Sequence, residues 1–418
     1  MSTISLSELN QQVRPIGLKF GSLTLVLAGL SMMGPFSIDT YLPSLPSLSQ
    51  SLGVSASQAQ QTVTAFLAFF AFMSLWHGSI SDACGRRRMT IVSLGIFAAA
   101  SAGCALAGSI GALLLFRALQ GATAGVGMVV GRAVVRDLYE GAEAQKLMSH
   151  VATIFTVAPV LAPVVGGWLQ VWFGWRSVFV FLVLFSTLLM AFCWRSLPET
   201  LPMKKRHRLA PAFLMRSYWK VLTNPPFILS CLSLGFCNAG FFIYIMSAPR
   251  FLMVHLGLEE TDFLWLFGPI AVGMMIGAWF SGRVAGRLSG RQTVYIAYGV
   301  MAVAALGNVA LNLLVEPVLP WTILPLFVFV VGMSAAMPSL TLMGMDLFPS
   351  QRGLAASCQG FIILGSNSVV SATIPAFWGT TLSLAATGLA CTAIGLATML
   401  LYVWFMNRGG QARHSVPA

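Results

Sequence analysis

Long apolar runs separated by short polar segments dominate this chain. A helix that crosses the hydrocarbon core of a bilayer needs about 20 mostly apolar residues. Runs of this kind lie at 20–42, 61–80, 89–107, 110–135, 147–171, 177–194, 226–249, 263–282, 292–315, 318–345, 353–378 and 382–405. The pattern predicts an all-α membrane protein with twelve transmembrane helices.

The longest polar stretch divides these spans into two sets of six. It predicts an N-terminal six-helix half at 1–196, a cytoplasmic linker at 197–224 and a C-terminal six-helix half at 225–418. A weak repeat supports the division, because a Gly-Arg pair follows span two at 85–86 and span eight at 290–291. Two like halves around a central path are a common design of secondary transporters.

The composition favours the bilayer as the main solvent. Hydrophobic residues make up 57% of the 418 residues and charged residues 9%, whereas soluble proteins carry about 25% charged residues. The seven cysteines form no CxxC pair and the five histidines no HExxH motif. We therefore expect no metal and no cofactor, with protons as the coupling ion if transport is driven.

The basic residues predict the orientation. The net charge is +12, with 24 Lys and Arg against 12 Asp and Glu. If both termini are cytoplasmic, the basic residues lie in inner segments except Arg117, Arg176 and Arg250, as expected for an inner-membrane protein. This topological explanation leaves no basic soluble face, so we expect no nucleic-acid partner. The first apolar run is too long for a cleaved signal and is expected to remain as the first span.

The loop after span two carries a motif, GSISDACGRRR at 78–88. It resembles the signature loop of the major facilitator superfamily, G-x-L-x-D-x-x-G-R-[RK]. Ala83 stands where that family usually has Arg, and Arg88 where Pro is common. The resemblance implies a cytoplasmic gate made by Gly78, Asp82, Gly85, Arg86, Arg87 and Asp137. The alternative is a basic loop that only sets the topology.

Span four contains a lone arginine in the sequence FRALQG at 116–121. A charge inside an apolar helix is costly unless it is paired or hydrated, so Arg117 is a functional candidate. The segment is similar to the family's R-x-x-Q-G motif, which implies proton coupling. Alternatively, Arg117 extends its side chain to the outer headgroups.

Span five contains APVLAPVVGG at 158–167. It resembles the G-P-x-x-G-G antiporter motif of drug exporters in the superfamily, with Ala162 in place of the first Gly. The residues that carry it are Pro159, Pro163, Gly166 and Gly167. Prolines interrupt the helix ladder and small residues allow close packing, so a purely structural kink is the alternative.

The end of span one reads DTYLPSLP at 39–46. This pattern resembles drug exporters of the bicyclomycin-resistance (Bcr/CflA) type, and GWRSVF at 174–179 agrees with it. The resemblance extends over most of the first half and is looser in the second. It implies the major facilitator fold and export of small amphipathic molecules.

Two charges suggest a mechanism. Asp39 is the only acid within or close to the core of a span, and both Asp39 and Arg117 lie near the outer ends of their spans, Arg117 at a depth of roughly 10 Å. We expect the two to face each other across the central cavity, where a proton and a cationic substrate would compete for Asp39. The alternative is that Asp39 caps a helix at the wet surface.

A transporter pocket is mostly apolar with a few hydrogen-bonding groups. The candidates for substrate contact are Tyr41, Gln61, Phe242, Tyr244, Gln359 and Asn367. The favoured function is a proton-coupled exporter, working as a monomer on small-molecule substrates. A proton-linked transporter of one metabolite, such as an amino acid, nucleoside or sugar, remains the alternative. An enzyme is disfavoured because no convergent catalytic set and no Walker A motif occur.

Overall fold

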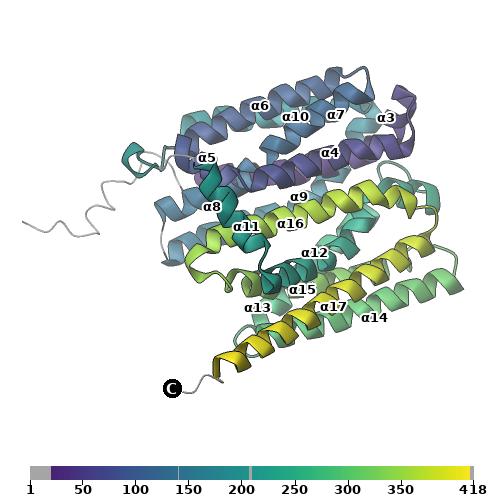
Figure 1. Ribbon diagram of the computed structural model, residues 1–418. Coiled ribbons are helices and arrows are strands. Elements are labelled where there is room, and N and C mark those ends of the chain that lie inside the picture. The colour runs from purple at the N-terminus through teal and green to yellow at the C-terminus, as the bar shows by residue number, and fades with distance from the viewer. Residues whose placement is uncertain (1–19, 140, 207–209, 415–418) are drawn as a thin grey trace, which may run out of the picture.

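The computed structural model describes residues 20–139, 141–206 and 210–414, and these residues form a helical bundle (Figure 1). The first set of spans comprises α2 (Phe20–Asp39), α4 (Ala56–Ser74) with α5 (His77–Cys84), α6 (Arg86–Leu106), α7 (Ile110–Ala124) with α8 (Val126–Leu138), α9 (Gly141–Phe173) and α10 (Arg176–Ser196). The second set comprises α12 (Pro225–Met246), α13 (Leu264–Val284), α14 (Gly290–Leu314), α15 (Leu324–Met345), α16 (Arg352–Thr373) and α17 (Thr381–His414).

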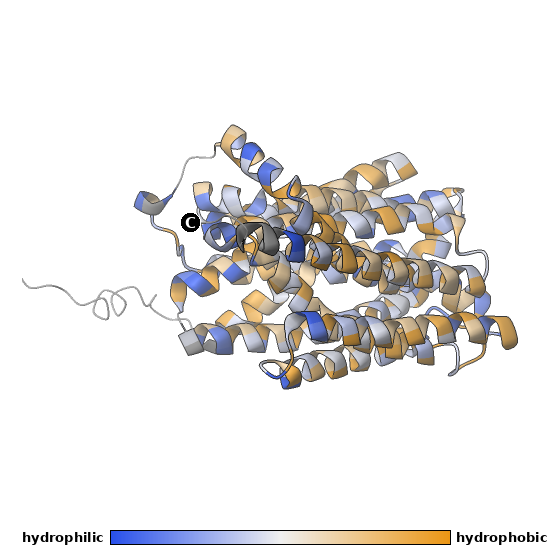
Figure 2. Cartoon of the chain, turned by 60° about the horizontal axis from the view of Figure 1, so that its bottom comes forward, coloured by the Kyte–Doolittle hydropathy of each residue, from blue (hydrophilic) through white to orange (hydrophobic). Residues whose placement is uncertain are grey.

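The predicted number of spans agrees with the structure. Eleven helices in the described part of the chain are long and apolar enough to cross a membrane, and the pair α4–α5, bent by 54°, makes a twelfth if it counts as one span. In Figure 2 the long helices are largely hydrophobic along their length, whereas hydrophilic residues gather toward the left-hand end of the bundle in this view. A lipid-facing surface of this kind is expected when hydrocarbon replaces water as the solvent.

Helix breaks differ from those expected. Span two is broken between Ser74 and His77, and span four is interrupted at Gly125. In contrast, α9 runs as one helix through both Pro159 and Pro163, although neither proline has an N–H to donate to the helix ladder. A membrane span can contain proline because groups on neighbouring helices form hydrogen bonds with the backbone carbonyls that proline leaves without a donor.

Several short elements lie outside the predicted spans. At one end are α3 (Leu45–Leu52), the single-turn η5 (Ile374–Ala376) and the π-helix η3 (Arg250–His255). We call this the Asp39 end and the opposite end, where α5 meets α6, the Arg86 end. The predicted linker contains a further helix, α11 (Pro211–Leu222), which crosses the Arg86 end from the first set of spans toward the second (Figure 1).

Glycines set the closest helix contacts. A Cβ atom added at Gly121 of α7 would meet the carbonyl oxygen of Phe66 in α4, and one at Gly277 of α13 would meet that of Val331 in α15. Small residues at these two positions therefore let the backbones of neighbouring helices approach closely. Without a hydrophobic force between helices in lipid, such backbone approach supplies the van der Waals contact that holds them together.

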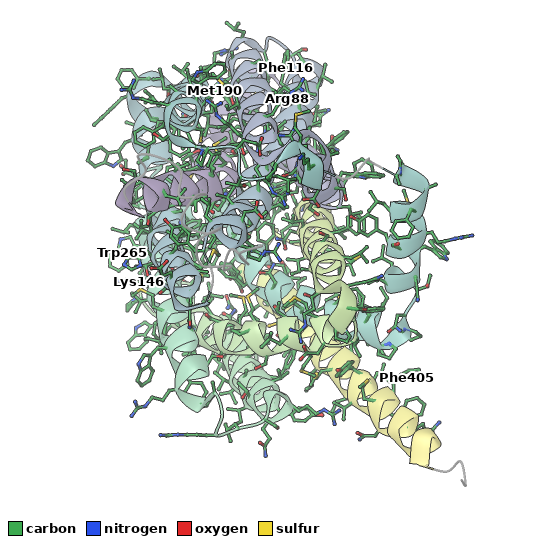
Figure 3. All side chains as sticks on the ribbon, turned by 90° about the vertical axis from the view of Figure 1, so that its left-hand side faces the viewer. Arg88, Phe116, Lys146, Met190, Trp265 and Phe405 are labelled. Carbon is green, nitrogen blue, oxygen red and sulfur yellow. The ribbon has the colours of Figure 1, made fainter. Side chains whose placement is uncertain are left out.

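The two sets of spans meet along two helix pairs, α4 with α16 and α9 with α13. Figure 3 looks onto the Arg86 end, and Lys146 of α9 and Trp265 of α13 project on the same flank of this view. Near the Arg86 end, the hydroxyl of Tyr218 in α11 donates a hydrogen bond to the carbonyl of Leu75 across 2.5 Å. Helix α11 therefore contacts the first set while its buried face packs on residues of the second.

Candidate functional site

Arg117 is buried inside the first set of spans, with no exposed surface. Its Nη1 donates to the carbonyl of Ser37 at 3.1 Å and to Oε1 of Gln120 at 2.9 Å. Its Nε lies 3.4 Å from the carbonyl of Thr62. The guanidinium thus joins α7 to the backbone of both α2 and α4, and it does not extend to the headgroups.

Aromatic rings enclose the same guanidinium. Its Cζ atom lies 4.7 Å from the ring centroid of Tyr41, 4.5 Å from that of Phe66 and 6.0 Å from that of Phe179. A cation over a ring face is stabilised, most strongly when it is desolvated. The Nη2 atom of Arg117 is buried and has no hydrogen-bond partner. Carbonyl oxygens and ring faces, not a carboxylate, therefore balance this cation.

Gln120, which accepts a hydrogen bond from Arg117, extends the hydrogen-bond network to α6. Gln120 donates from Nε2 to Oγ of Ser101 in α6 at 2.7 Å. The thiol of Cys104 donates to Oε1 of Gln120 at 3.6 Å. Since Gln120 is fully buried, these bonds satisfy an amide that would otherwise be costly in the apolar interior. The Arg and Gln of the FRALQG segment form one network across α2, α4, α6 and α7.

Asp39 ends α2 and is buried, with 8% of its surface exposed. Neither Asp39 nor Arg117 takes part in an ion pair between the described residues. The expectation that they face each other is wrong for this conformation. Tyr41, whose ring contacts Arg117, follows Asp39 by two positions in helical backbone. Two such positions are turned by about 200°, which directs Asp39 away from Arg117.

The two sets of spans are joined at the Asp39 end. Gln60 of α4 donates from Nε2 to Oγ of Ser371 in α16 at 3.1 Å, and the Thr64 hydroxyl lies 2.9 Å from the same oxygen. The Ser368 hydroxyl donates to the carbonyl of Thr64 at 3.2 Å. These bonds lie within the α4–α16 contact and close this end of the bundle.

The two glycines of the span-five motif lie in the same region. A Cβ at Gly166 would meet the carbonyl oxygen of Thr40, the residue after Asp39. A Cβ at Gly167 would meet the carbonyl oxygen of Glu260, which precedes α13. Close packing at this motif, expected from the sequence, is confirmed. Gly166 seats α9 against the end of α2, and Gly167 seats it against the second set.

At the Arg86 end, the predicted gate residues form a charge cluster. Arg86 contacts Oδ1 of Asp82 from Nη1 at 2.5 Å and Oδ2 of Asp137 from Nε at 3.2 Å. The same Oδ2 accepts a hydrogen bond from the Thr200 hydroxyl at 2.7 Å. Because α5, α6 and α8 each contribute one charged residue, Arg86 ties three helices together. Gly78 lies on α5 opposite the side chain of Val129 in α8.

The segment after α10 completes this cluster and was not predicted. Oε1 of Glu199 accepts from the backbone N–H of Arg86 at 2.9 Å, and its Oε2 pairs with Arg206 at 3.3 Å. Gly85 has φ +98°, and a Cβ there would meet both Glu199 and Arg206. Two features therefore require glycine at position 85: the positive φ angle, and the lack of room for a Cβ atom next to Glu199 and Arg206. Arg87 turns away from the cluster and donates to the carbonyl of Trp194 at 2.5 Å.

His77 lies where the breaks in spans two and four meet. It is fully buried, and its Nε2 is 3.0 Å from the carbonyl of Ala122, near the end of α7. A carbonyl only accepts, so Nε2 carries the proton, while Nδ1 is buried with no partner. A Cβ at Gly125 would contact the His77 ring. Neither His77 nor Ala122 belongs to a motif that would have identified this contact from the sequence.

Of the candidates for substrate contact, two tyrosines are buried within their own sets of spans. The Tyr41 hydroxyl lies 2.8 Å from Oγ1 of Thr62. The Tyr244 hydroxyl accepts from Nδ2 of Asn308 at 2.7 Å. Both hydroxyls are satisfied by protein groups in this conformation, and Asn308 links α14 to α12.

The remaining candidates have different surroundings. Gln359 is buried and donates to the carbonyl of Thr341 at 3.1 Å, and Oδ1 of Asn367 accepts from Asn238 at 2.7 Å. Phe242 is half-buried, and Gln61 is exposed. It is the neighbouring Gln60, missed by the sequence analysis, that reaches across to the second set. Gln60 and Gln61 are adjacent in α4, so their side chains point in directions about 100° apart, and only Gln60 faces the second set.

A cavity of about 140 Å³ lies between α2, α8 and α9, and Arg132 of α8 contributes to its lining. Apolar side chains such as Leu27 and Met148 form most of the wall, together with Ser31. Arg132 was counted with the inner basic residues and was not selected as a site residue. Its position inside a span makes it a second membrane-embedded cation beside Arg117.

Two six-helix sets packed against each other are a common design of secondary transporters. Residues 25–370 match the Major Facilitator Superfamily. The chain belongs to this superfamily, whose members are transporters. The sequence-based identification of the family is confirmed.

Comparisons with individual proteins agree. The chain is 30% identical to an uncharacterized MFS-type transporter, YdgK, of Bacillus subtilis over 85% of this chain and 89% of that protein. It is 29% identical to a chloramphenicol resistance protein of Pseudomonas aeruginosa, covering 82% and 81%, and 27% identical to a bicyclomycin resistance protein homolog of Haemophilus influenzae, covering 66% and 69%. These relatives confirm the resemblance to the bicyclomycin-resistance type.

The fold also has solved counterparts. A peptide transporter POT superposes with a TM-score of 0.73 at 14% identity, covering 98% of this chain and 99% of that chain. An identity this low establishes the shared fold alone.

Proposed function

We propose that this protein exports small amphipathic molecules, drugs among them, across the bacterial inner membrane in exchange for protons. The names of two relatives support drug export, since they are described by resistance to chloramphenicol and to bicyclomycin. The proposal includes a monomeric state and no cofactor besides the coupling proton.

The proposed orientation has both termini and the Arg86 end in the cytoplasm and the Asp39 end outside. Basic residues are concentrated toward the Arg86 end, where Arg86, Arg206 and Arg352 lie in loops or at helix starts. Inner loops of membrane proteins carry an excess of Lys and Arg. In this orientation the hydrogen bonds between α4 and α16 lie toward the outside, and we expect substrate to enter from the cytoplasm.

One observation carries the antiport proposal: the buried carboxyl of Asp39 lies one residue from the contact between Thr40 and Gly166. The adjacent glycine, Gly167, meets Glu260 of the second set. A change in the occupancy of Asp39 can therefore be transmitted through α2 and α9 to the contact that seals the outer side. Coupling of this kind needs packed elements with two discrete arrangements, which helices in close backbone contact provide.

The chemistry rests on exclusive occupancy of Asp39. A buried carboxyl with no ion-pair partner can be satisfied by a proton or by the cationic or hydrogen-bonding group of a substrate, but not by both. Substrate arriving from the cytoplasm displaces the proton inward, and a proton arriving from outside displaces the substrate outward. Arg117 acts indirectly in this proposal, because it holds the carbonyl of Ser37 and so fixes the end of α2.

The cluster around Arg86 acts as the cytoplasmic gate. Its ion pairs hold α5, α6 and α8 as one unit, and the halves rock against each other so that the cytoplasmic and outer sides open in turn. Rigid-body motion of one helix bundle against the other is the usual form of alternating access in transporters of this design.

Proton movement in proteoliposomes tests this function. Chloramphenicol, bicyclomycin and a lipophilic cation would be added in turn to vesicles with a trapped pH-sensitive dye, alongside an amino acid, a nucleoside and a sugar. We expect proton flux on adding several chemically unrelated drugs. Flux with one metabolite alone would replace drug export by the specific-metabolite function, and substrate transport without proton flux would refute coupling.

A further inference from the structure

A cavity of about 180 Å³ lies between the two sets of spans at the Asp39 end. One wall comes from α3 and the start of α4, including Leu45 and Gln50. The other comes from the π-helix η3 and from Trp378, which follows η5. Because each set supplies one wall, the cavity exists only while the two sets are together at this end.

Arg250 supplies the charge of this cavity. It begins η3 and is half-buried, and its Nε atom is buried with no hydrogen-bond partner. It takes part in none of the ion pairs between the described residues. Its Cζ atom lies 5.8 Å from the ring centroid of Trp378. A partly buried cation without a neighbouring anion is unfavourable, so a bound anion would stabilise Arg250 at this position.

The rest of the lining has a definite chemical character. Leu45, Met253 and Val254 are apolar, whereas Ser49 and Gln50 offer hydrogen-bonding groups, and the lining contains no acidic residue. Trp378 is held in place through its carbonyl, 3.0 Å from Nε2 of His255. An anionic head with a short apolar tail matches this arrangement.

We propose that this cavity binds an amphipathic organic anion from the outer side, with a carboxylate or phosphate on Arg250 and the tail against Trp378 and Met253. A planar guanidinium binds either anion through two parallel hydrogen bonds. This site is separate from Asp39 and Arg117, and anion binding does not depend on the proposed export function; only the assignment of the cavity to the outer side rests on the proposed orientation.

Occupancy has a mechanical consequence. A ligand that contacts both walls binds only the state closed at the Asp39 end, and it therefore shifts the population toward that state. An anion in this cavity slows the alternation of the two states and inhibits transport from outside.

The test uses the full chain in nanodiscs of phosphatidylcholine, with octanoate as the probe and binding heat as the readout. We expect saturable binding that weakens at least tenfold in Arg250→Gln, about 1.4 kcal/mol, because the hydrogen bonds between the guanidinium and the carboxylate are lost. Arg250→Lys should retain part of the affinity, and octanol should show no saturable binding. The matched control is Arg176→Gln, because Arg176 also lies at the Asp39 end and its Cζ is 4.1 Å from the Trp175 ring centroid.

Equal octanoate affinity in wild type and Arg250→Gln would overturn the proposal, as would the absence of saturable binding to wild-type protein that unfolds at its usual temperature. Nanodiscs that contain phosphatidylglycerol identify the source of the anion. Competition with octanoate that depends on Arg250 assigns the site to a lipid phosphate. Unchanged affinity assigns it to a free organic anion, and both results support an anion site.

Discussion

The guanidinium of Arg117 donates a hydrogen bond to the backbone carbonyl of Ser37 across 3.1 Å, two residues before Asp39. The intramembrane cation thus contacts the helix that carries the intramembrane acid without pairing with the acid. This relationship divides the roles between the two residues. Asp39 is left for proton and substrate, while Arg117 fixes the position of α2.

Replacing Asp39 with Asn removes the group that can bind and release a proton. We expect Asp39→Asn to abolish proton-coupled export while expression and thermal stability stay near wild type, because a neutral amide is less costly to bury than a carboxylate. The measurement is dye-reported proton flux in proteoliposomes together with resistance of cells. Glu316→Gln, at an exposed acid, serves as the control. Wild-type flux in Asp39→Asn would exclude Asp39 from the coupling mechanism.

Truncating Arg117 should damage transport more than a change that keeps the charge. Arg117→Lys retains a cation between the aromatic rings but cannot reach Ser37, Thr62 and Gln120 together, so partial activity is expected. Arg117→Ala loses every contact and leaves a cavity, at a cost of about 2–5 kcal/mol by analogy with other large-to-small core changes. Transport rates and thermal unfolding of both variants would be compared. Equal wild-type activity in the two would contradict a positioning role.

A side chain at Gly166 should loosen the outer seal. In Gly166→Ala the new methyl group meets the carbonyl oxygen of Thr40, and overpacking of this kind costs about 1–3 kcal/mol. We expect a lower unfolding temperature and a several-fold loss of coupled transport. Gly360→Ala is the matched control, since a Cβ at Gly360 of α16 meets no atom within 4 Å. The packing argument fails if both variants behave alike.

Removing the charge of Asp82 should affect the rate of the conformational cycle. Asp82→Asn breaks its 2.5 Å ion pair with Arg86 and leaves a neutral hydrogen bond to Ser81 as the contact of Arg86 with α5, so α5 is held less firmly to α6. We expect slower turnover with substrate affinity largely unchanged, measured as transport rate against equilibrium binding. Asp346→Asn is a suitable control, because Asp346 forms an exposed pair with Arg352. A defect in affinity alone would argue against a gate.

His77 should contribute to stability through one hydrogen bond. His77→Leu leaves the carbonyl of Ala122 buried without a donor, which costs about 1–3 kcal/mol. His77→Gln retains a donor at similar reach and should recover part of the loss. Thermal unfolding in detergent measures both variants. If the two are equally stable, the bond between His77 and Ala122 contributes nothing to joining the breaks of spans two and four.

The sequence determined the spans and the family of this protein. Hydrocarbon leaves no alternative to internally bonded helices, so about 20 apolar residues are enough to locate a span. Asp82 and Arg86 were likewise predictable, because their motif places them at the ends of two consecutive helices. Segments 45–52 and 211–222 were not recognised as helices, since they are too short to give the signal of a membrane span.

Only the tertiary structure decided which polar groups meet. Rotation of a helix by one residue, about 100°, separates exposed Gln61 from Gln60, which bonds to Ser371, and a two-residue offset turns Asp39 away from Arg117. Hydropathy does not report such rotations, because the lipid-facing and the protein-facing positions of a membrane span are both apolar. The partners of Arg117 and Arg250 therefore depended on how distant segments pack, and this packing left one cation bonded to backbone carbonyls and the other without an anion.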